Sequence, residues 1–385
     1  MDYRKLKADR LFDGYRFLDD KVLIVSTEGI IEDIVASADA GEGIETVNGA
    51  LTPGFINCHC HLELSHMRGL IPERTGLVDF VFKVVTERHH SEEEILVAID
   101  KAETEMLENG IVAVGDICNN SLTLAQKQRG RLSYYNFIEA SGWLPSVYQP
   151  RFERAKDVAT DFSILDHPYS IVPHAPYSVS ENLWREIQPF FEGKTVSIHN
   201  QETAFEDEFF QKGSGDFTRM YDMMKIDNTH HVPTERSSLQ SYFNKLRGAS
   251  NAILVHNTFT QQGDLDYIQL QTPNSKLQIF FCLCVNANRY IENALPPIEM
   301  LRKNNCNIVL GTDSLASNWS LNILDEIRAI RQSQPSIPLE ELLSWSTING
   351  ARALNMHNRL GSFEKGKRPG VVVLDEEALT ARRIL

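Results

Sequence analysis

The feature that most constrains this sequence is a repeated alternation, starting at Gly54, of apolar runs with polar or helix-forming segments. Eight apolar runs can be counted, at residues 54–61, 111–118, 132–139, 169–174, 194–199, 252–256, 277–284 and 307–313. Most are apolar throughout, which is typical of a parallel sheet with both faces covered by helices. Eight such units in about 300 residues predict an α/β fold, the (β/α)8 TIM barrel. The alternative, an open doubly wound sheet, is disfavoured because no glycine-rich phosphate loop follows the first run.

The two ends of the chain depart from this alternation. Residues 1–52 contain short strand-like runs, such as 21–26 and 30–35, and residues 358–385 contain another, GVVVLD, among glycines. Neither end shows a long helical periodicity. We therefore expect both ends to pair into one small β-sandwich domain, beside a barrel that spans residues 53–357.

Composition disfavours several classes of protein. The 385-residue chain has a formal net charge of −14, which argues against a nucleic-acid partner because nothing would offset the repulsion of the phosphates. No apolar run approaches about 20 residues, so no membrane span is expected. The first residues are polar and contain no apolar signal core, which predicts a cytoplasmic protein. The six cysteines are then expected to be thiols.

The first apolar run ends in two histidines, His59 and His61. Side chains alternate between the two faces of a strand, so both imidazoles point the same way and can bind one metal ion. Cys58 and Cys60 point the other way and are expected to be small packing residues. An HxH pair alone is a weak signal. Its interpretation therefore depends on what the other strands carry.

Side chains suited to metal binding or acid–base chemistry end most of the other runs as well. In a barrel of this kind the chemistry lies at the carboxyl ends of the strands. The residues found there are His59, His61, Glu139, His174, His199, His256 and Asp313. Three histidines and a carboxylate, with one position left open for water, are typical of a catalytic metal centre. Such a centre lowers the pKa of bound water towards about 7.

Several motifs resemble the amidohydrolase superfamily. They are His59 and His61 after PGFIN, the H-x-x-E of His199 and Glu202, His256 on the sixth strand, and GTDS around Asp313. The resemblance covers the whole chain, including the closing LGSFEKGKRPGVVVLD. The H-x-x-E spacing is similar to the aminohydrolase (deaminase) and chlorohydrolase branch. HLELS and HAPYSVS are similar to aminodeoxyfutalosine deaminases and to adenosine and S-adenosylhomocysteine deaminases.

The resemblance implies an aminohydrolase, a hydrolase of carbon–nitrogen bonds other than peptide bonds, acting on an amino-substituted heteroaromatic ring in a purine nucleoside-like molecule. It implies one Zn2+ per chain, with Fe2+ as the alternative, bound by His59, His61, His199 and Asp313. Glu202 would move a proton to the ring, while His256 and Asp313 would orient and help to deprotonate the water. The implied substrate contacts are His174, Glu63, Glu139 and Asn288.

Other interpretations stay open. After the seventh strand, residues 284–288 read Cys-Val-Asn-Ala-Asn, where the branch usually has Cys-Pro-x-Ser-Asn, so the shape of the substrate is open. A dechlorinating or cyclic-amide hydrolase of the same superfamily is one alternative. The cyclic-amide members commonly use a lysine on the fourth strand, where this chain has His174. A catalytically inactive barrel that acts as a binding protein is another, although every implied ligand is present.

Two expectations concern the surroundings of the site. The loop at residues 213–233 contains Met, Tyr and Phe side chains that can cover the pocket and stack on a flat ring. A packed lid that contacts no ligand is the equal alternative. Members of the superfamily often self-associate, so the resemblance implies a homodimer.

Overall fold

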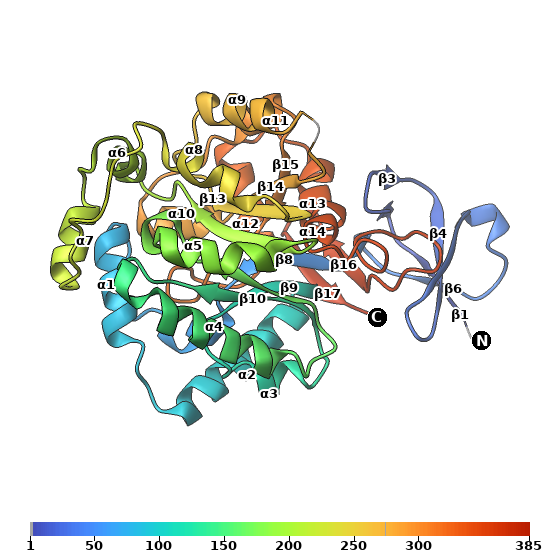
Figure 1. Cartoon of the computed structure of the whole chain (residues 1–385). Coiled ribbons are helices and arrows are strands. Elements are labelled where there is room, and N and C mark those ends of the chain that lie inside the picture. The colour runs from blue at the N-terminus through green and yellow to red at the C-terminus, as the bar shows by residue number, and fades with distance from the viewer. Residues whose placement is uncertain (1–2, 274) are drawn as a thin grey trace.

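The computed structural model describes residues 3–273 and 275–385, and eight parallel strands form its centre (Figure 1). These strands follow the eight apolar runs; they are β8 (Phe55–Cys60), β9 (Ile111–Cys118), β10 (Ser133–Ala140), β11 (Tyr169–Pro173), β12 (Thr195–Asn200), β13 (Asn251–His256), β14 (Gln278–Leu283) and β15 (Asn307–Leu310). They form two four-stranded sheets, ordered β11-β10-β9-β8 and β12-β13-β14-β15. Their side chains fill the largest apolar core of the molecule.

Backbone hydrogen bonds join the two sheets at the carboxyl ends of the strands. At one seam, the N–H groups of Thr312 and Asp313 both donate to the carbonyl of His59, at 3.0 Å. At the other seam, the N–H of His199 donates to the carbonyl of His174, also at 3.0 Å. The predicted (β/α)8 fold is confirmed. Both seams run through residues predicted for the functional site.

Helices surround the strands (Figure 1). They are α1 (Leu77–Glu87), α2 (Glu92–Glu108), α3 (Leu124–Lys127), α4 (Tyr148–Phe162), α5 (Glu181–Ile187), α6 (Phe205–Lys212), α7 (Phe217–Met223), α8 (Ser238–Tyr242), α9 (Gln262–Gln271), α10 (Val285–Ile291), α11 (Ile298–Lys303), α12 (Ile323–Ser333), α13 (Leu339–Ser346) and α14 (Ile348–Ala353). Within the described residues, no helix is long and apolar enough to cross a membrane.

Two helices show how the sequence determines the boundaries. Helix α2 begins after Ser91, whose hydroxyl accepts the N–H of Glu94 while the Glu94 carboxylate accepts the N–H of Ser91. The helical periodicity over residues 339–354 predicts one helix, but the chain breaks at Thr347 into α13 and α14. After this break Gly350 lies against Ile56, so close that a Cβ on Gly350 would come within 2.9 Å of the Ile56 Cβ. Tertiary packing therefore overrides the periodicity here.

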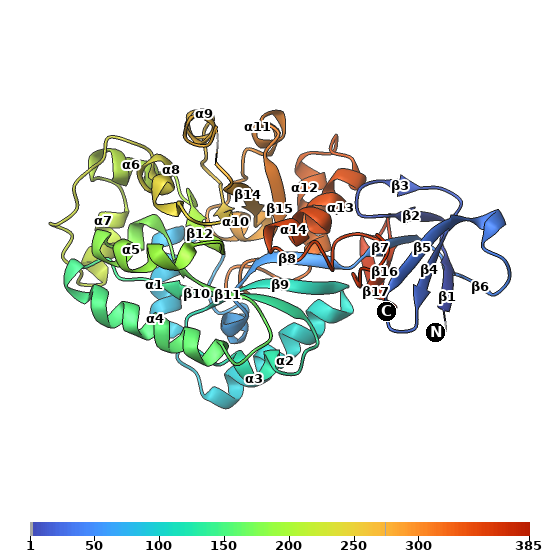
Figure 2. The same ribbon diagram turned by 45° about the vertical axis from the view of Figure 1, so that its right-hand side comes forward.

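A small β-domain lies beside the barrel (Figure 2). One sheet has the order β5-β4-β1-β6, formed by β5 (Ile31–Ala36), β4 (Lys21–Ser26), β1 (Tyr3–Lys7) and β6 (Ile44–Thr46). The second has the order β17-β16-β7-β2-β3, formed by β17 (Thr380–Arg383), β16 (Val371–Asp375), β7 (Ala50–Pro53), β2 (Arg10–Phe12) and β3 (Phe17–Leu18). Because β16 pairs with β7, the two ends of the chain share a sheet, as the sequence predicts. The boundaries at residues 52 and 358 stay predictions.

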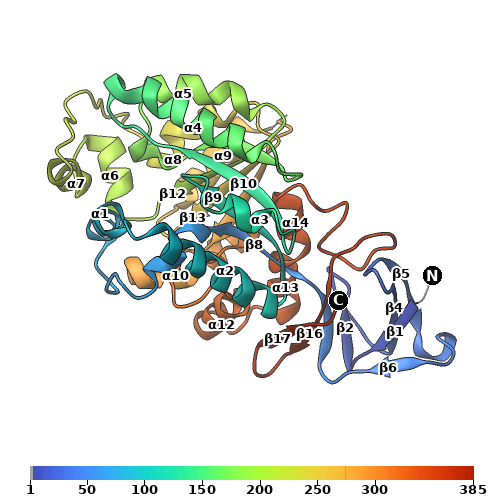
Figure 3. The same cartoon turned by 90° about the horizontal axis from the view of Figure 1, so that it is seen from below.

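The β-domain and the carboxyl ends of the barrel strands lie at opposite ends of the molecule. In Figure 3, α1, α6 and α7 gather on the far side of the barrel from the β-domain, and Figure 1 shows the same separation. Residues of α1 and α7 line a large cavity at this end, together with His61, His199 and Asp313. The elements that enclose the candidate site therefore include the helices after β8 and β12, and α4 after β10.

Candidate active site

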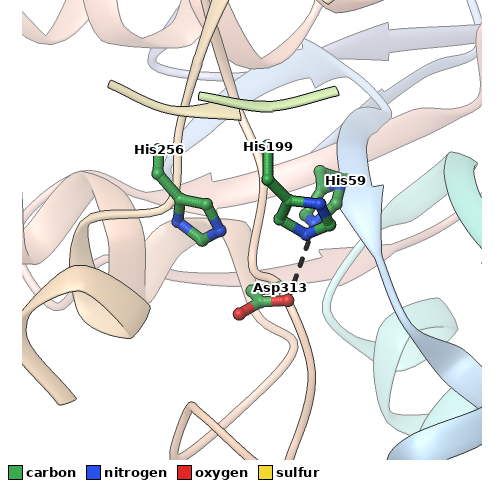
Figure 4. A group of neighbouring side chains, drawn as sticks. All are labelled: His59, His199, His256 and Asp313. Carbon is green, nitrogen blue, oxygen red and sulfur yellow. Dashed lines mark ion pairs between the residues drawn. The ribbon is translucent and has the colours of Figure 1, made fainter. Parts of the chain in front are cut away.

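Four side chains from different strands converge at the carboxyl end of the barrel (Figure 4). His59, His199, His256 and Asp313 each offer one nitrogen or oxygen atom, and these atoms all lie within 4.8 Å of one another. The Nε2 atom of His61 lies 3.2 Å from the Nε2 of His59 and 3.3 Å from the Oδ1 of Asp313. All five residues are buried. The structure thus brings together the four predicted ligands, with His256 beside them.

The backbone aims two of these side chains into the cluster. His256 has φ +74° and Asp313 has φ +59°. Residues other than glycine seldom adopt this left-handed conformation, and those that do concentrate at functional sites. At Asp313 the two hydrogen bonds from residues 312 and 313 to the His59 carbonyl hold the turn.

The protonation states of the cluster follow from its burial. Burial lowers the pKa of His61 to about 3 and the pKa of His199 well below its ordinary value, and neighbouring imidazoles add to the effect. Burial alone would raise the pKa of Asp313, but its hydrogen bond with His59 and the surrounding imidazoles hold that pKa well below its ordinary range. At neutral pH, His61 and His199 are therefore neutral and Asp313 is a carboxylate.

This set of donors fits a transition-metal ion. His256 shows why: its Nδ1 donates to the Oδ1 of Asn288 at 2.8 Å, which leaves its Nε2 as the unprotonated nitrogen. That Nε2 is buried and has no hydrogen-bond partner among the described residues. A buried polar atom without a partner costs free energy unless a ligand satisfies it. Imidazole nitrogens with one carboxylate oxygen are the ligands that zinc and iron(II) take in catalytic sites.

A second group, Glu139, His174 and His199, also has ligand atoms within 4.8 Å of one another. It shares His199 with the first group, and the His199 Nδ1 lies 2.8 Å from the carbonyl oxygen of His174. The Nδ1 of His174 is bonded to the Ser178 hydroxyl at 2.8 Å. Only one nitrogen of His199 is left to bind an ion, so the two groups cannot each hold one independently.

Glu202 lies two residues after β12 and lines the cavity with His256 and Asp313. One of its carboxyl oxygens is 3.6 Å from the Nε2 of His256. Burial raises the pKa of Glu202 well above its ordinary value, and the nearby Asp313 charge adds to this. A raised pKa favours the protonated form, so this carboxyl group is suited to hold a proton and pass it on.

Two more of the predicted acids, Glu63 and Glu139, line the same cavity. Burial raises the pKa of each to about 7. Asn119 connects them, because its N–H donates to Glu63 at 3.0 Å and its side-chain amide donates to Glu139 at 2.8 Å. Arg88, which the sequence does not single out from other surface arginines, forms a 2.9 Å ion pair with Glu63. His174 lines the cavity too, and burial lowers its pKa to about 4.

Asn288 differs from its predicted place. It is buried and does not line the cavity; its side-chain oxygen accepts from His256, and its amide nitrogen lies 3.4 Å from the His256 carbonyl. The amide that follows the seventh strand is thus engaged by the histidine of the sixth. The predicted substrate contact would need Asn288 to act through His256.

The cavity at the site has a volume of about 950 Å³. Its apolar wall includes Phe80 and Val84 from α1, Met220 from α7, and Trp143. Its other wall includes the exposed Arg151 and Arg154 from α4, and no carboxylate among the described residues lies within 4.0 Å of either guanidinium. The cavity therefore combines an apolar wall with two arginines that have no carboxylate partner among the described residues.

The segment predicted to cover the pocket contains α7 and packs against the cavity wall. Trp143 stacks on Tyr221, with ring centroids 5.5 Å apart and planes 10° from parallel, and its indole N–H donates to Asn228 at 2.7 Å. His231 stacks on Phe209 at 4.1 Å, which gives it a packing role. Met220, Tyr221, Met224 and Ile226 of this segment face the cavity.

Sequence reasoning missed three buried charged residues next to the site. Asp116 on β9 accepts the N–H of Leu62 at 2.9 Å and pairs with the wholly buried Lys127 at 2.5 Å. Glu206 on α6 accepts the N–H groups of Gln201 and Glu202. Lys127 and Glu206 lie in segments rich in polar residues, whereas Asp116 lies within the apolar run 111–118. The sequence signals are that Glu206 comes four residues after Glu202 and that Asp116 is the one charge in an apolar run; Lys127 carries no such signal.

The chain is similar to known proteins along nearly its whole length. A 5-methylthioadenosine/S-adenosylhomocysteine deaminase of Teredinibacter turnerae is 25% identical over 386 residues, which cover 94% of this chain and 80% of the relative. The crystal structure of Helicobacter pylori aminofutalosine deaminase with methylthio-coformycin has a TM-score of 0.79 at 23% identity, covering 96% of this chain and 92% of that one. An adenosine deaminase structure from Xanthomonas campestris with bound zinc has a TM-score of 0.73 at 22% identity, covering 97% and 85%.

The two solved structures, at these identities, show a shared fold. The amidohydrolase family itself matches residues 50–383, which include every strand of the barrel and every residue of the metal-binding cluster. This family is metal dependent and hydrolyses carbon–nitrogen bonds other than peptide bonds, so the predicted enzyme class is confirmed. The chain belongs to the amidohydrolase family.

Proposed function

We propose that this protein is a zinc-dependent aminohydrolase that removes the amino group from the adenine ring of a nucleoside carrying an acidic extension. Water and the substrate are consumed, and the ring carbonyl compound and ammonia are formed. The observation that carries the proposal is the position of the buried Glu202 carboxyl group. One of its oxygens lies 3.6 Å from His256, beside a cluster of metal-binding side chains, and the residue lines the large cavity.

His59, His61, His199 and Asp313 are the proposed ligands of one zinc ion. Bound zinc lowers the pKa of a water molecule towards about 7 and so supplies hydroxide at neutral pH. The bound zinc in the Xanthomonas campestris relative supports this choice over iron.

The remaining residues handle protons. Asp313 and the unprotonated Nε2 of His256 accept hydrogen bonds from the attacking water and orient it. Glu202 takes a proton from the water and delivers it to a ring nitrogen, which draws electrons away from the carbon under attack. The hydroxyl group added to the ring carbon then gives its proton to the same carboxyl, which passes it to the departing amino group, so that a ring carbonyl forms and ammonia leaves as a neutral molecule.

The cavity wall supports a substrate larger than adenosine. Its volume of about 950 Å³ is at the upper end of the range of about 300–1,000 Å³ seen for drug-sized ligands. His174, Glu63 and Glu139 are the proposed polar contacts of the nucleoside, and Asn288 holds His256 in its tautomer. Arg151 and Arg154, which have no carboxylate partner among the described residues, would pair with an acid on the substrate.

The test is ammonia release by the zinc-loaded enzyme from two uncharged substrates, adenosine and 5′-methylthioadenosine, and two that carry a carboxylate, S-adenosylhomocysteine and aminodeoxyfutalosine. We expect activity on an acidic substrate, and a loss of about 1,000-fold in kcat for Glu202→Gln. Glu208→Gln, which changes an exposed acid on α6, is the matched control and should behave like the wild type.

The outcomes separate the proposal from its alternatives. Preference for the uncharged substrates would contradict the acidic extension alone. If none of the four substrates released ammonia while one zinc was bound per chain, deamination of adenine nucleosides would be contradicted. Chloride release from chlorinated heterocycles would then identify a dechlorinating hydrolase.

A further inference from the structure

The turn that presents Glu202 has an unusual backbone. Gln201, between Asn200 at the end of β12 and Glu202, has φ +44°, a left-handed conformation in a residue that is not glycine. Such a conformation persists only where the surroundings hold it. Two successive N–H groups, those of Gln201 and Glu202, point to one side of this turn and converge on a single carboxylate.

That carboxylate belongs to Glu206 of α6. Its Oε1 accepts the N–H of Gln201 at 3.0 Å and its Oε2 accepts the N–H of Glu202 at 3.2 Å. Glu206 has no solvent exposure, and the hydroxyl of Ser238, on α8, donates to its Oε1 at 2.5 Å. The carboxylate is thereby fixed between two helices and the turn.

The side chain of Gln201 is fixed as well. Its amide donates to Asp264 at 2.8 Å and to Asp207 at 3.1 Å, and the Thr260 hydroxyl donates to its oxygen at 2.7 Å. By contrast, the carboxyl group of Glu202 forms no hydrogen bond within the described part of the chain; its closest charged neighbour is His256 at 3.6 Å. The backbone of the turn, and not a partner of the side chain, therefore determines where the Glu202 carboxyl group lies.

We propose that Glu206 is a positioning residue: its carboxyl group clamps the Gln201–Glu202 turn and so holds the Glu202 carboxyl group at its working distance from the substrate. The proposal rests on the proposed function, because it takes Glu202 as the proton carrier. Glu206 does not line the cavity and so does not touch the substrate. Its motif is the spacing H-x-x-E-x-x-x-E, in which the second glutamate comes four residues after the first.

The test is Glu206→Gln, which keeps the size of the side chain but places an amide NH₂ group against one of the two backbone N–H donors. Glu208→Gln on the same helix is the matched control, because Glu208 is exposed and lies outside the site. Ser238→Ala is the milder second variant, since it removes the donor to Glu206 and leaves the carboxylate.

For Glu206→Gln we expect kcat to fall about 10- to 100-fold, since a displacement of about 1 Å is enough for such a loss. Zinc content and KM should stay within about twofold of the wild type, and the acidic limb of the kcat–pH profile should shift, because Glu202 has a new environment. Ser238→Ala should lower kcat a few-fold in the same direction. A purely structural role would lower the melting temperature without moving the pH profile of the folded enzyme.

A crystal structure of Glu206→Gln gives a readout that does not depend on any substrate. We expect a displaced Glu202 carboxyl group with His199 and the other zinc ligands in place. An unmoved Glu202, or wild-type kcat with a wild-type pH profile, would overturn the proposal. If the wild type itself releases no ammonia, the proposed function fails, and the position of Glu202 in the crystal still decides whether Glu206 holds the turn.

Discussion

The turn after β8 and the turn after β12 are both held by a buried carboxyl group, but the charge of that group is balanced differently in each. Each strand carries predicted zinc ligands, and in each turn a buried carboxylate on a neighbouring element accepts backbone N–H groups. Asp116 accepts the N–H of Leu62, next to His61. Glu206 accepts the N–H groups of Gln201 and Glu202. In both places a side chain, rather than the sheet, determines the path of the chain into the site.

The two carboxylates differ in how their charge is balanced. Asp116 is paired with the buried ammonium of Lys127, which also donates to Asn136 at 2.7 Å. Glu206 has no cation within 4.0 Å among the described residues, only N–H and hydroxyl donors, and burial raises its pKa to about 8. The comparison teaches that a turn can be held either by a matched charge pair or by a carboxyl group that titrates near neutral pH.

The largest expected effect comes from breaking the charge pair. Lys127→Met leaves Asp116 buried without its cation, which should lower the free energy of unfolding by about 3–5 kcal/mol. Lys156→Met, at a partly exposed surface pair, is the control and should cost less than about 1 kcal/mol. Denaturant unfolding of the two variants measures this. If both variants lost the same small amount of unfolding free energy, the buried pair of Asp116 and Lys127 would stabilise the protein no more than a surface pair does.

The second effect is a pH dependence confined to the turn after β12. The folded-state pKa of Glu206 is about 8 and its ordinary value is 4.5, so the folded protein keeps a proton that the unfolded chain releases between these values. Stability from Glu206 is present below about pH 4.5 and is lost as pH rises through 8, by about 5 kcal/mol in all.

The difference in unfolding free energy between wild type and Glu206→Gln isolates this contribution, measured at pH 5, 7 and 9. The free energy of unfolding of the wild type should fall relative to that of Glu206→Gln as the pH rises. A difference that is constant over this range would show that Glu206 does not titrate there, and the comparison between the two turns would lose its electrostatic basis.

The smallest effect concerns metal affinity. In a Lys127→Met background, Asp116→Asn keeps an acceptor for the Leu62 N–H, whereas Asp116→Leu removes it. Outer partners of ligands typically change metal affinity about 10- to 100-fold, so the Leu variant should bind zinc about 10-fold more weakly than the Asn variant. Competition with a chelator measures the ratio. Equal affinities would mean that the Leu62 turn does not support His61.

The sequence allows the side chains of the metal-binding cluster to be predicted, but not the residues that hold the turns carrying them. His199 and Asp313 can be predicted because each ends an apolar run. The strands of such a barrel are parallel, so their carboxyl ends lie together. Glu206 lies in the acidic segment ETAFEDEFF, where the ordinary expectation is a solvated helix start. Lys127 lies in a polar stretch that gives no local sign of burial.

The break at Thr347 and the engagement of Asn288 by His256 are unpredictable for the same reason. Both depend on which segments pack against each other, and that information is spread over the whole chain. Local spacing identifies the chemistry of a strand end, whereas tertiary contacts decide which buried charges support it.

The most direct test of the central claim is the reaction of the zinc-loaded enzyme with an acidic adenine nucleoside in water enriched in oxygen-18. We predict that each turnover releases one ammonia and places one oxygen-18 atom on the ring carbon that carried the amino group, as seen by mass spectrometry of the product. An unlabelled product, or turnover without ammonia, would contradict hydrolytic deamination by this site.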